Sequence, residues 1–144
     1  MEDDMKFRHT LPVQIRFSDV DQYGHMNNSS YFSLYDLAKT SYMRDVFGDK
    51  DWKHIGIVVA NINADFLAPV FFSDDLVIHT SVIHLGHKSF TLLQRAVNKA
   101  SGVLKCQCRT INLRIGLFRS VRTHRHFIQK RIDIFENTRF VIQP

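Results

Sequence analysis

Cysteine, proline and glycine are scarce in this chain, which has two, three and six of them among 144 residues. The two cysteines, Cys106 and Cys108, are separated by one residue, and side chains so close in sequence rarely form an unstrained disulfide. Two thiols without a second pair of ligands also do not make a zinc site. We therefore expect reduced thiols and a cytoplasmic protein.

A long apolar run is missing as well. The first ten residues, MEDDMKFRHT, are charged and lack the apolar stretch of a signal peptide, and no later stretch approaches the length of a membrane-spanning helix. Charged residues make up 23% of the chain and the net charge is +5, a modest excess for a protein that binds nucleic acid. The sequence thus predicts neither a membrane segment nor a nucleic-acid partner.

Apolar residues, in contrast, are plentiful enough for a core. Hydrophobic residues account for 44% of the chain and aromatic residues for 12%. A chain of this length and composition needs neither metals nor disulfides to fold as one domain. We predict a single domain over residues 1–144, with residues 1–8 as a loosely attached tail.

The spacing of apolar residues predicts the strands and helices of the chain. Apolar residues alternate over residues 11–18, which predicts a half-buried first strand with Ile15 and Phe17 among its inward side chains. After residue 27 they recur at helical spacing, which predicts one helix of about five turns that ends near Gly48. Four further strands are expected at residues 56–66, 76–85, 89–98 and 103–115, and a short C-terminal helix at residues 124–135.

This order of elements predicts an α+β fold. One helix that is apolar on a single face cannot cover both faces of a five-stranded antiparallel sheet. We expect a curved antiparallel β-sheet wrapped around one long central α-helix, with its edge or outer face closed by a second copy of the chain. Asn61, Asn63 and Asp65 share one face of the second strand. A dimer interface, the lining of a site or plain solvent exposure would account for them.

Residues 16–31, RFSDVDQYGHMNNSSY, contain the densest cluster of reactive side chains. They join the first strand to the start of the helix. A carboxylate placed just ahead of a helix start faces free backbone N–H groups and the positive end of the helix dipole. Such N–H groups polarise a carbonyl oxygen, while the carboxylate activates water or attacks the carbonyl carbon itself. The segment therefore indicates chemistry on a carbonyl group.

The same segment resembles the Asp-x-Asp-x-x-Gly-His-(Val/Met)-Asn-Asn-x-x-Tyr signature of hotdog-fold acyl-CoA thioesterases of the 4-hydroxybenzoyl-CoA thioesterase type. Every fixed position is filled, by Asp19, Asp21, Gly24, His25, Met26, Asn27, Asn28 and Tyr31. The resemblance implies the hotdog fold and hydrolysis of an acyl-CoA thioester to free acid and coenzyme A. It also implies a homodimer or a homotetramer.

The resemblance further implies a role for the matched residues. Asp21 would be the catalytic carboxylate, as general base or as nucleophile, and the N–H near Asn28 would polarise the thioester carbonyl. His25 would position water or hold the carbonyl, and Asn27 would orient Asp21. Hydrogen bonding within the turn is the alternative role of both. Tyr31 would contact the substrate.

Coenzyme A would enter only as part of the substrate, and no cofactor is implied. Related proteins bind its nucleotide near the turn between the third and fourth strands, where this chain has His87, Lys88 and Ser89. Several histidines are grouped in pairs, but no acidic or thiol pattern completes a metal site around them. These residues are His84, His87, His124 and His126. We therefore predict no metal.

Two alternatives compete with an acyl-CoA thioesterase. One is a thioesterase for acyl carrier proteins, because a positive surface suits an acidic carrier as well as coenzyme A. The other is a non-catalytic acyl-CoA-binding module on the same fold, because a fold alone does not fix a function. Retention of both Asp19 and Asp21 favours an enzyme. Asp19 is expected to form the turn, and Asp36 to be an exposed charge on the helix.

Overall fold

The structure, a computed structural model, describes residues 4–48, 56–115 and 121–137, without the side chains of residues 115 and 121–127. Strands and helices follow the chain in the order predicted from the sequence. They are β1 (His9–Pro12), the 3-10 turn η2 (Phe17–Asp19), α1 (Asn28–Phe47), β2 (Gly56–Phe66), β3 (Leu76–Leu85), β4 (Ser89–Asn98), β5 (Leu104–Ile115) and α2 (Val121–Glu136).

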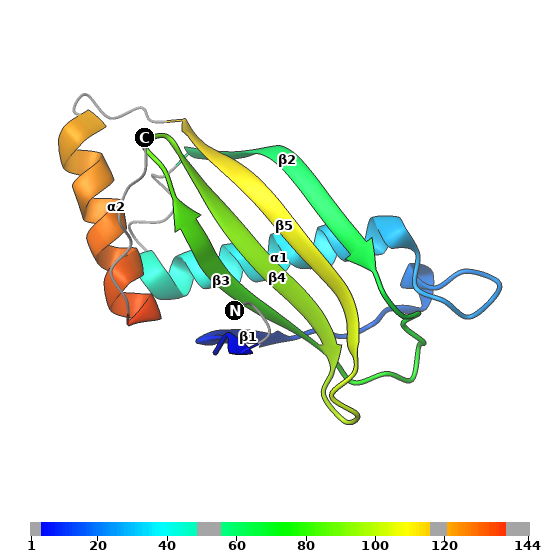
Figure 1. The fold of residues 1–144 in the computed structure, drawn as a ribbon. Coiled ribbons are helices and arrows are strands. Elements are labelled where there is room, and N and C mark those ends of the chain that lie inside the picture. The colour runs from blue at the N-terminus through cyan, green and yellow to red at the C-terminus, as the bar shows by residue number, and fades with distance from the viewer. Residues whose placement is uncertain (1–3, 49–55, 116–120, 138–144) are drawn as a thin grey trace.

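The strands form one antiparallel sheet in the order β1-β3-β4-β5-β2. β3, β4 and β5 are joined by short turns and pair with their neighbours in sequence, while β2 crosses to the far edge beside β5. The sheet curves around α1, as Figure 1 shows. The α+β class and the curved sheet around a long helix are therefore confirmed.

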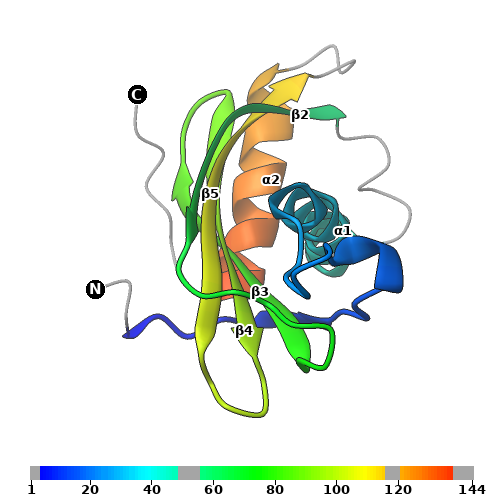
Figure 2. The same ribbon diagram turned by 90° about the vertical axis from the view of Figure 1, so that its right-hand side faces the viewer.

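Helix α1 lies against the concave face of the sheet, and α2 lies on the same side (Figure 2). The apolar stripe of α1 is buried as the helical spacing predicted. The stripe consists of Tyr31, Leu34, Tyr35, Ala38, Tyr42 and Val46. Each large apolar side chain buried in this way contributes about 1.5–3 kcal/mol to stability. On the opposite side of α1, Leu37 is 55% exposed, so only one face of the helix is covered by the described chain.

Helix α2 docks on the C-terminal half of α1 through an apolar cluster that includes Ile128 and Ile132, and through polar contacts. The Tyr42 hydroxyl donates to Glu136 Oε1 at 2.6 Å, and the same oxygen accepts the Val82 N–H at 3.3 Å. Arg131 Nη2 donates to the Phe47 carbonyl at 2.8 Å, near the end of α1, where cations are favoured by the helix dipole. The predicted C-terminal helix is confirmed, with a somewhat greater length.

The first strand is shorter than predicted. β1 pairs with residues 77–80 of β3, and the last backbone contact runs from the Val13 N–H to the Leu76 carbonyl at 3.0 Å. β3 begins at Leu76, so the chain beyond this point has no neighbour to pair with. It turns through η2 instead, and Phe17 is 85% exposed rather than inward.

A bulge in β2 also alters the predicted alternation. The pairing with β5 shifts between Val59 and Asn61, which puts Val59 opposite the buried Asn112 on the helix side. After the bulge, Asn61, Asn63 and Asp65 lie on the outer face of the sheet. All three are exposed in a single copy of the chain.

Part of the predicted N-terminal tail rests on this outer face. The Phe7 ring stacks on His79 with 5.4 Å between ring centroids, and the Arg95 guanidinium lies 5.5 Å from the Phe7 centroid. On the inner face, the free thiols of Cys106 and Cys108 point into the core. Burial raises the pKa of both, that of Cys108 to about 12, which makes them poor nucleophiles.

Candidate active site

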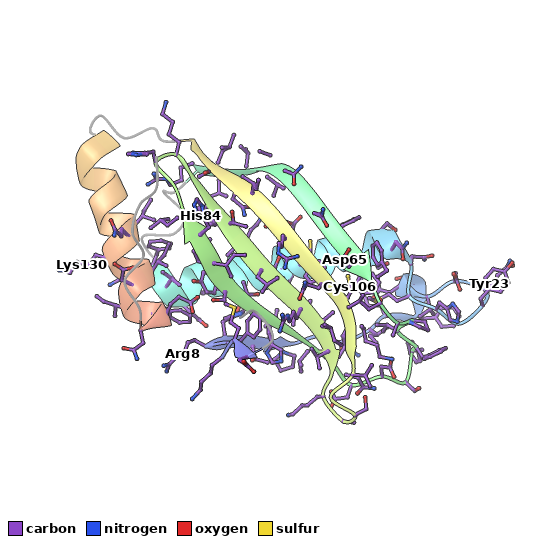
Figure 3. The ribbon with its side chains drawn as sticks, in the orientation of Figure 1. Arg8, Tyr23, Asp65, His84, Cys106 and Lys130 are labelled. Atoms are coloured by element: carbon purple, nitrogen blue, oxygen red, sulfur yellow. The ribbon has the colours of Figure 1, made fainter. Side chains whose placement is uncertain are left out.

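Residues 20–27 form a loop that projects beyond the end of the sheet (Figure 1). An isolated backbone pairing of Val20 with Met26 closes its base. At the bend, Gly24 has a φ of 80°, a conformation that side chains other than glycine rarely adopt. Tyr23 is 75% exposed and lies at the outer end of the loop, away from the sheet (Figure 3).

The Asp21 carboxylate shapes this loop from within. Its Oδ1 accepts the N–H groups of Tyr23 at 2.8 Å and His25 at 3.2 Å. The Asp21 N–H donates to the His25 carbonyl at 2.8 Å, and the Gly24 N–H to the Asp21 carbonyl at 3.0 Å. Within the described part of the chain, Oδ2 accepts no hydrogen bond. One carboxylate oxygen is therefore fixed and the other is open to a ligand.

Asp19 anchors the loop to the rest of the chain. It is 2% exposed, and its carboxylate accepts the Arg16 N–H at 2.7 Å, Nε at 3.3 Å and Nη2 at 3.0 Å. Its carbonyl accepts the Asn27 N–H at 2.8 Å and the Ser30 hydroxyl at 3.5 Å. Burial raises the pKa of the Asp19 carboxyl, but the hydrogen bonds and charge of Arg16 outweigh it and hold that pKa below its ordinary value. Asp19 thus forms the turn, as expected.

The start of α1 is left uncapped. Asn27 occupies the N-cap position, yet its side chain makes no capping hydrogen bond. The Ser30 N–H donates to the Asn27 carbonyl at 2.9 Å. No hydrogen bond to a described residue is made by the N–H groups of Asn28 and Ser29, which belong to the first turn that a helix cannot satisfy by itself. Together with the helix dipole, they make a site for a partly negative oxygen.

The other residues of the signature divide between loop and core. The His25 ring packs edge-on against Phe71, with 5.3 Å between centroids, so it is held beside the loop. Tyr31 is 3% exposed and packs edge-on against Phe66 at 5.3 Å. Burial raises the pKa of Tyr31 to about 12. The structure thus keeps Asp21 and Gly24 in the loop ahead of α1, packs the His25 ring on Phe71 and places Tyr31 in the core.

The predicted nucleotide-binding residues lie elsewhere. His87, Lys88 and Ser89 form the turn after β3, at the opposite end of the sheet from the loop. The ten residues of β3 separate the two by about 33 Å. Arg114 braces the turn, with Nη2 donating to the His87 carbonyl and its N–H to the Lys88 carbonyl. A single copy of the chain does not bring these residues to Asp21.

A family model described as the thioesterase-like superfamily matches residues 15–131, most of the chain. The chain belongs to this superfamily. The YsmA protein of Bacillus subtilis strain 168, which is named as uncharacterized, is 32% identical over 80 residues, covering 56% of this chain and 54% of the relative. The matched part thus spans about half the length of that relative.

Two further proteins with assigned names are similar to the chain. The acyl-CoA thioester hydrolase YbgC of Escherichia coli O157:H7 is 26% identical over 96 residues, which cover 65% of this chain and 72% of that protein. A thioesterase of Thermus thermophilus, solved with coenzyme A and Zn, superposes with a TM-score of 0.76 and 23% identity over 91% of this chain and 96% of that chain. The predicted family and hotdog fold are therefore confirmed.

An apolar rim surrounds the start of α1 in this thioesterase-family chain. Phe17 packs edge-on against Phe72 and Phe32 against Phe66, each pair with 6.5 Å between centroids. With Phe71, all five rings are at least 37% exposed. A contiguous exposed apolar patch of this kind marks a binding or assembly surface rather than a solvated one.

Two cavities flank α1 further along. An open groove of about 590 Å³ lies between the helix and residues 11–16. A smaller space of about 140 Å³ lies between α1 and the inner face of the sheet. We call it the interior pocket; its lining includes Phe32, Lys39, Val59, Ile62, Gln94 and Thr110.

The sequence analysis missed the polar residues of this pocket. The sequence did contain a signal for Gln94. The side chains of β4 that face the helix are Phe90, Leu92, Gln94 and Ala96, and Gln94 is the polar one. A buried amide in an otherwise apolar row requires hydrogen-bond partners. Among the described residues, no three His, Cys, Asp or Glu side chains gather as metal ligands; the side chains of residues 124 and 126 lie outside that part. No described helix is long and apolar enough to cross a membrane.

Proposed function

We propose that this protein hydrolyses acyl-CoA thioesters to a free acid and coenzyme A. The observation that carries the proposal is the open Oδ2 of Asp21 in the segment that leads into the uncapped start of α1. Membership of the thioesterase-like superfamily and the name of the YbgC relative support it. Coenzyme A takes part only as a portion of the substrate, and we propose no further cofactor.

In this reaction the N–H groups of Asn28 and Ser29 bind the thioester carbonyl oxygen and stabilise the negative charge that develops on it. Asp21 takes a proton from water as the water oxygen attacks the carbonyl carbon. The C–S bond then breaks, and the sulfur leaves with that proton as the thiol. In a second route the Asp21 carboxylate attacks the carbon, expels the thiolate and forms a mixed anhydride, which water hydrolyses.

Thiol release from a series of acyl-CoAs tests the proposal. Asp21→Asn keeps the shape of the side chain but removes the base and nucleophile, so we expect kcat to fall at least about a hundredfold. Asp45→Asn, at the exposed far end of the same helix, serves as the control and should retain activity. Equal rates for wild type and Asp21→Asn would remove Asp21 from the mechanism.

Labelled water separates the two routes. In a single turnover in ¹⁸O-water, attack by water puts the label directly into the free acid. Formation of an anhydride at Asp21 instead places the label in the Asp21 carboxylate when water attacks that carbon, or in the acid when it attacks the acyl carbon. Label in the Asp21 carboxylate, detected by peptide mass spectrometry, therefore establishes the nucleophilic route.

Two alternative functions give different results in the same assay. A higher kcat/KM for an acyl group carried by acyl carrier protein than for the same group on coenzyme A would favour the carrier-protein thioesterase. Tight acyl-CoA binding by calorimetry without thiol release would favour the binding module. The cytoplasmic location stays a prediction, which cell fractionation checks.

We further propose that a second copy of the chain pairs with β2. This eleven-residue edge strand has one described neighbour, β5. Val58, Ile62 and Phe66 are each at least 42% exposed on it. A long, apolar, open edge is unstable in isolation and favours pairing with another chain. A two-fold pairing of β2 with its own copy would continue the sheet and cover these side chains.

Such a dimer would also bring the predicted nucleotide-binding turn of one copy toward Asp21 of the other. In an antiparallel β2 pair, the Phe66 end of one strand meets the Gly56 end of the other. The turn of Lys88 in the second copy would then lie at the same end as Asp21 of the first. Its strand β4 would be two strand spacings, about 10 Å, from the pairing edge. A coenzyme A molecule is long enough to span from one residue to the other.

Light scattering tests the assembly. We expect a mass of about 34 kDa, twice the 16.8 kDa of the chain, or about 67 kDa if two dimers associate. Val58→Lys places a charge on the apolar edge and should give about 17 kDa, whereas Ile134→Lys, on α2 and 68% exposed, should not. A wild-type monomer would contradict the proposed assembly.

A further inference from the structure

The interior pocket has a polar floor and walls that are partly apolar and partly formed by the Asp36–Lys39 ion pair. Phe32, Val59 and Ile62 line its sides, and Gln94 and Thr110 lie on the inner face of the sheet. Gln94 is 1% exposed and Thr110 is 6% exposed, so both are removed from bulk solvent. Cavities of about 150 Å³ hold one ring or a short chain, and this pocket, at about 140 Å³, is close to that size.

The pocket lies within reach of the start of α1. Its helical lining runs from Phe32 to Lys39, so its middle lies about 10 Å along the helix from Asn28, at 1.5 Å per residue. A group whose carbonyl is held at the helix start therefore reaches the pocket with about its eighth carbon, at about 1.3 Å per bond of an extended chain. A shorter acyl group, such as butanoyl, does not reach it.

Both floor residues have an unused hydrogen-bonding atom. Gln94 Nε2 donates to the Tyr35 carbonyl at 2.9 Å and to Thr80 Oγ1 at 3.2 Å. Because the Tyr35 carbonyl oxygen can only accept a hydrogen bond, the atom of the Gln94 amide that faces it must be the nitrogen. Gln94 Oε1 then accepts no hydrogen bond from any residue in the described ranges.

Thr110 offers the complementary atom. Its Oγ1 accepts a hydrogen bond from Asn112 Nδ2 at 3.0 Å. Its own hydroxyl proton has no acceptor among residues 4–48, 56–115 and 121–137. Gln94 pairs with Cys108 across the strands, so Thr110 is its diagonal neighbour on the same face, about 7 Å away. One hydroxyl placed between them would accept from Thr110 and donate to Gln94.

We propose that the interior pocket binds the far end of the acyl group and selects an end that carries a neutral hydroxyl. The inference rests on the proposed thioesterase function. A plain apolar end would cover both floor atoms and leave them without partners, which costs about tenfold in binding for each. A carboxylate end gains little, because the Lys39 ammonium is already 3.1 Å from Asp36 Oδ1. The hydroxyl belongs either to a chain or to an aromatic ring.

Matched substrate pairs test this selection. The chain pair is 8-hydroxyoctanoyl-CoA and octanoyl-CoA, and the ring pair is 4-hydroxycinnamoyl-CoA and cinnamoyl-CoA. We expect kcat/KM to be at least tenfold higher for the hydroxylated member of one pair, and that pair identifies the source of the hydroxyl. Butanoyl-CoA reports on the reaction alone, because its acyl group ends short of the pocket.

Two variants link the preference to the floor of the pocket. Thr110→Val removes the hydroxyl with little change in volume, so it should bring the ratio of the two members close to one. Thr110→Ser restores the hydroxyl and should retain the ratio. Thr91→Val, on the outer face of the sheet, is the matched control, and melting temperatures show that each variant is folded.

Three results would overturn the proposal. A ratio of one or less in both pairs, with butanoyl-CoA turned over, rejects the selection and leaves the thioesterase function intact. If folded Thr110→Val still prefers the hydroxylated substrate, the preference comes from other residues. No thiol release from any substrate, butanoyl-CoA included, rejects both the function and the inference.

Discussion

Removing the Asp19 side chain should be among the most costly single changes near the loop of residues 20–27. In Asp19→Ala, the Arg16 N–H loses a buried charged acceptor at 2.7 Å, which costs about 1.5–3 kcal/mol. The pair with the guanidinium adds little to this cost, because the Arg16 side chain is 66% exposed and its charge is screened by solvent. We therefore expect a loss of about 1.5–3 kcal/mol in the free energy of unfolding, nearly all of it from the backbone hydrogen bond.

Urea denaturation of three variants separates these contributions. Arg16→Ala removes the guanidinium but keeps the backbone bond, so it should destabilise the protein much less than Asp19→Ala does. The double variant should have the same unfolding free energy as Asp19→Ala within the error of the measurement. If Asp19→Ala and Arg16→Ala cost the same, the backbone bond is not the anchor and the argument for Asp19 as the fixed point of the loop is wrong.

Buried groups supply the remaining predictions. Because the folded-state pKa of Asp19 lies below its ordinary value of 3.8, its stabilising contribution is complete above that pH and lost as the pH falls below it. The difference in unfolding free energy between wild type and Asp19→Asn should therefore shrink below about pH 4. Tyr42→Phe removes the donor to the Glu136 carboxylate and should cost about 1.5–3 kcal/mol in urea denaturation. Leu92→Ala, at a fully buried position, should cost about 2–5 kcal/mol, whereas Leu37→Ala at an exposed position should cost less than about 0.5 kcal/mol.

The elements that the sequence predicted best are those whose pattern has a local cause. β3 and β4 have the predicted bounds, because turn residues that include Gly86 and Gly102 mark where each strand ends. The position at which β1 ends is determined by a strand that lies far along the chain. The pairing of β1 stops where β3 begins, at Leu76, more than sixty positions further along the chain. The alternation of apolar residues up to Phe17 therefore could not show that the strand ends at Pro12.

The candidate site divides in the same way. The loop could be predicted because Asp21, Gly24 and His25 interact with one another over a few residues. The interior pocket could not, because Gln94 and Thr110 meet α1 only after two strands and a helix have packed together. A linear motif therefore predicts where the proposed substrate would react but contains no information about where its other end would bind.

Two features of the single chain point to a missing partner. The β2 edge exposes apolar side chains on both faces, which is unfavourable in a monomer. The loop of residues 20–27 projects into solvent, where it encloses no substrate. Both occur near the Phe66 end of β2, beside the uncapped start of α1. A partner strand that covers this edge would bury the aromatic rim, exclude water from the helix start and strengthen its attraction for a developing negative charge. Variants of Val58, which does not line the interior pocket, that prevent assembly should accordingly lose thioesterase activity even though they retain Asp21.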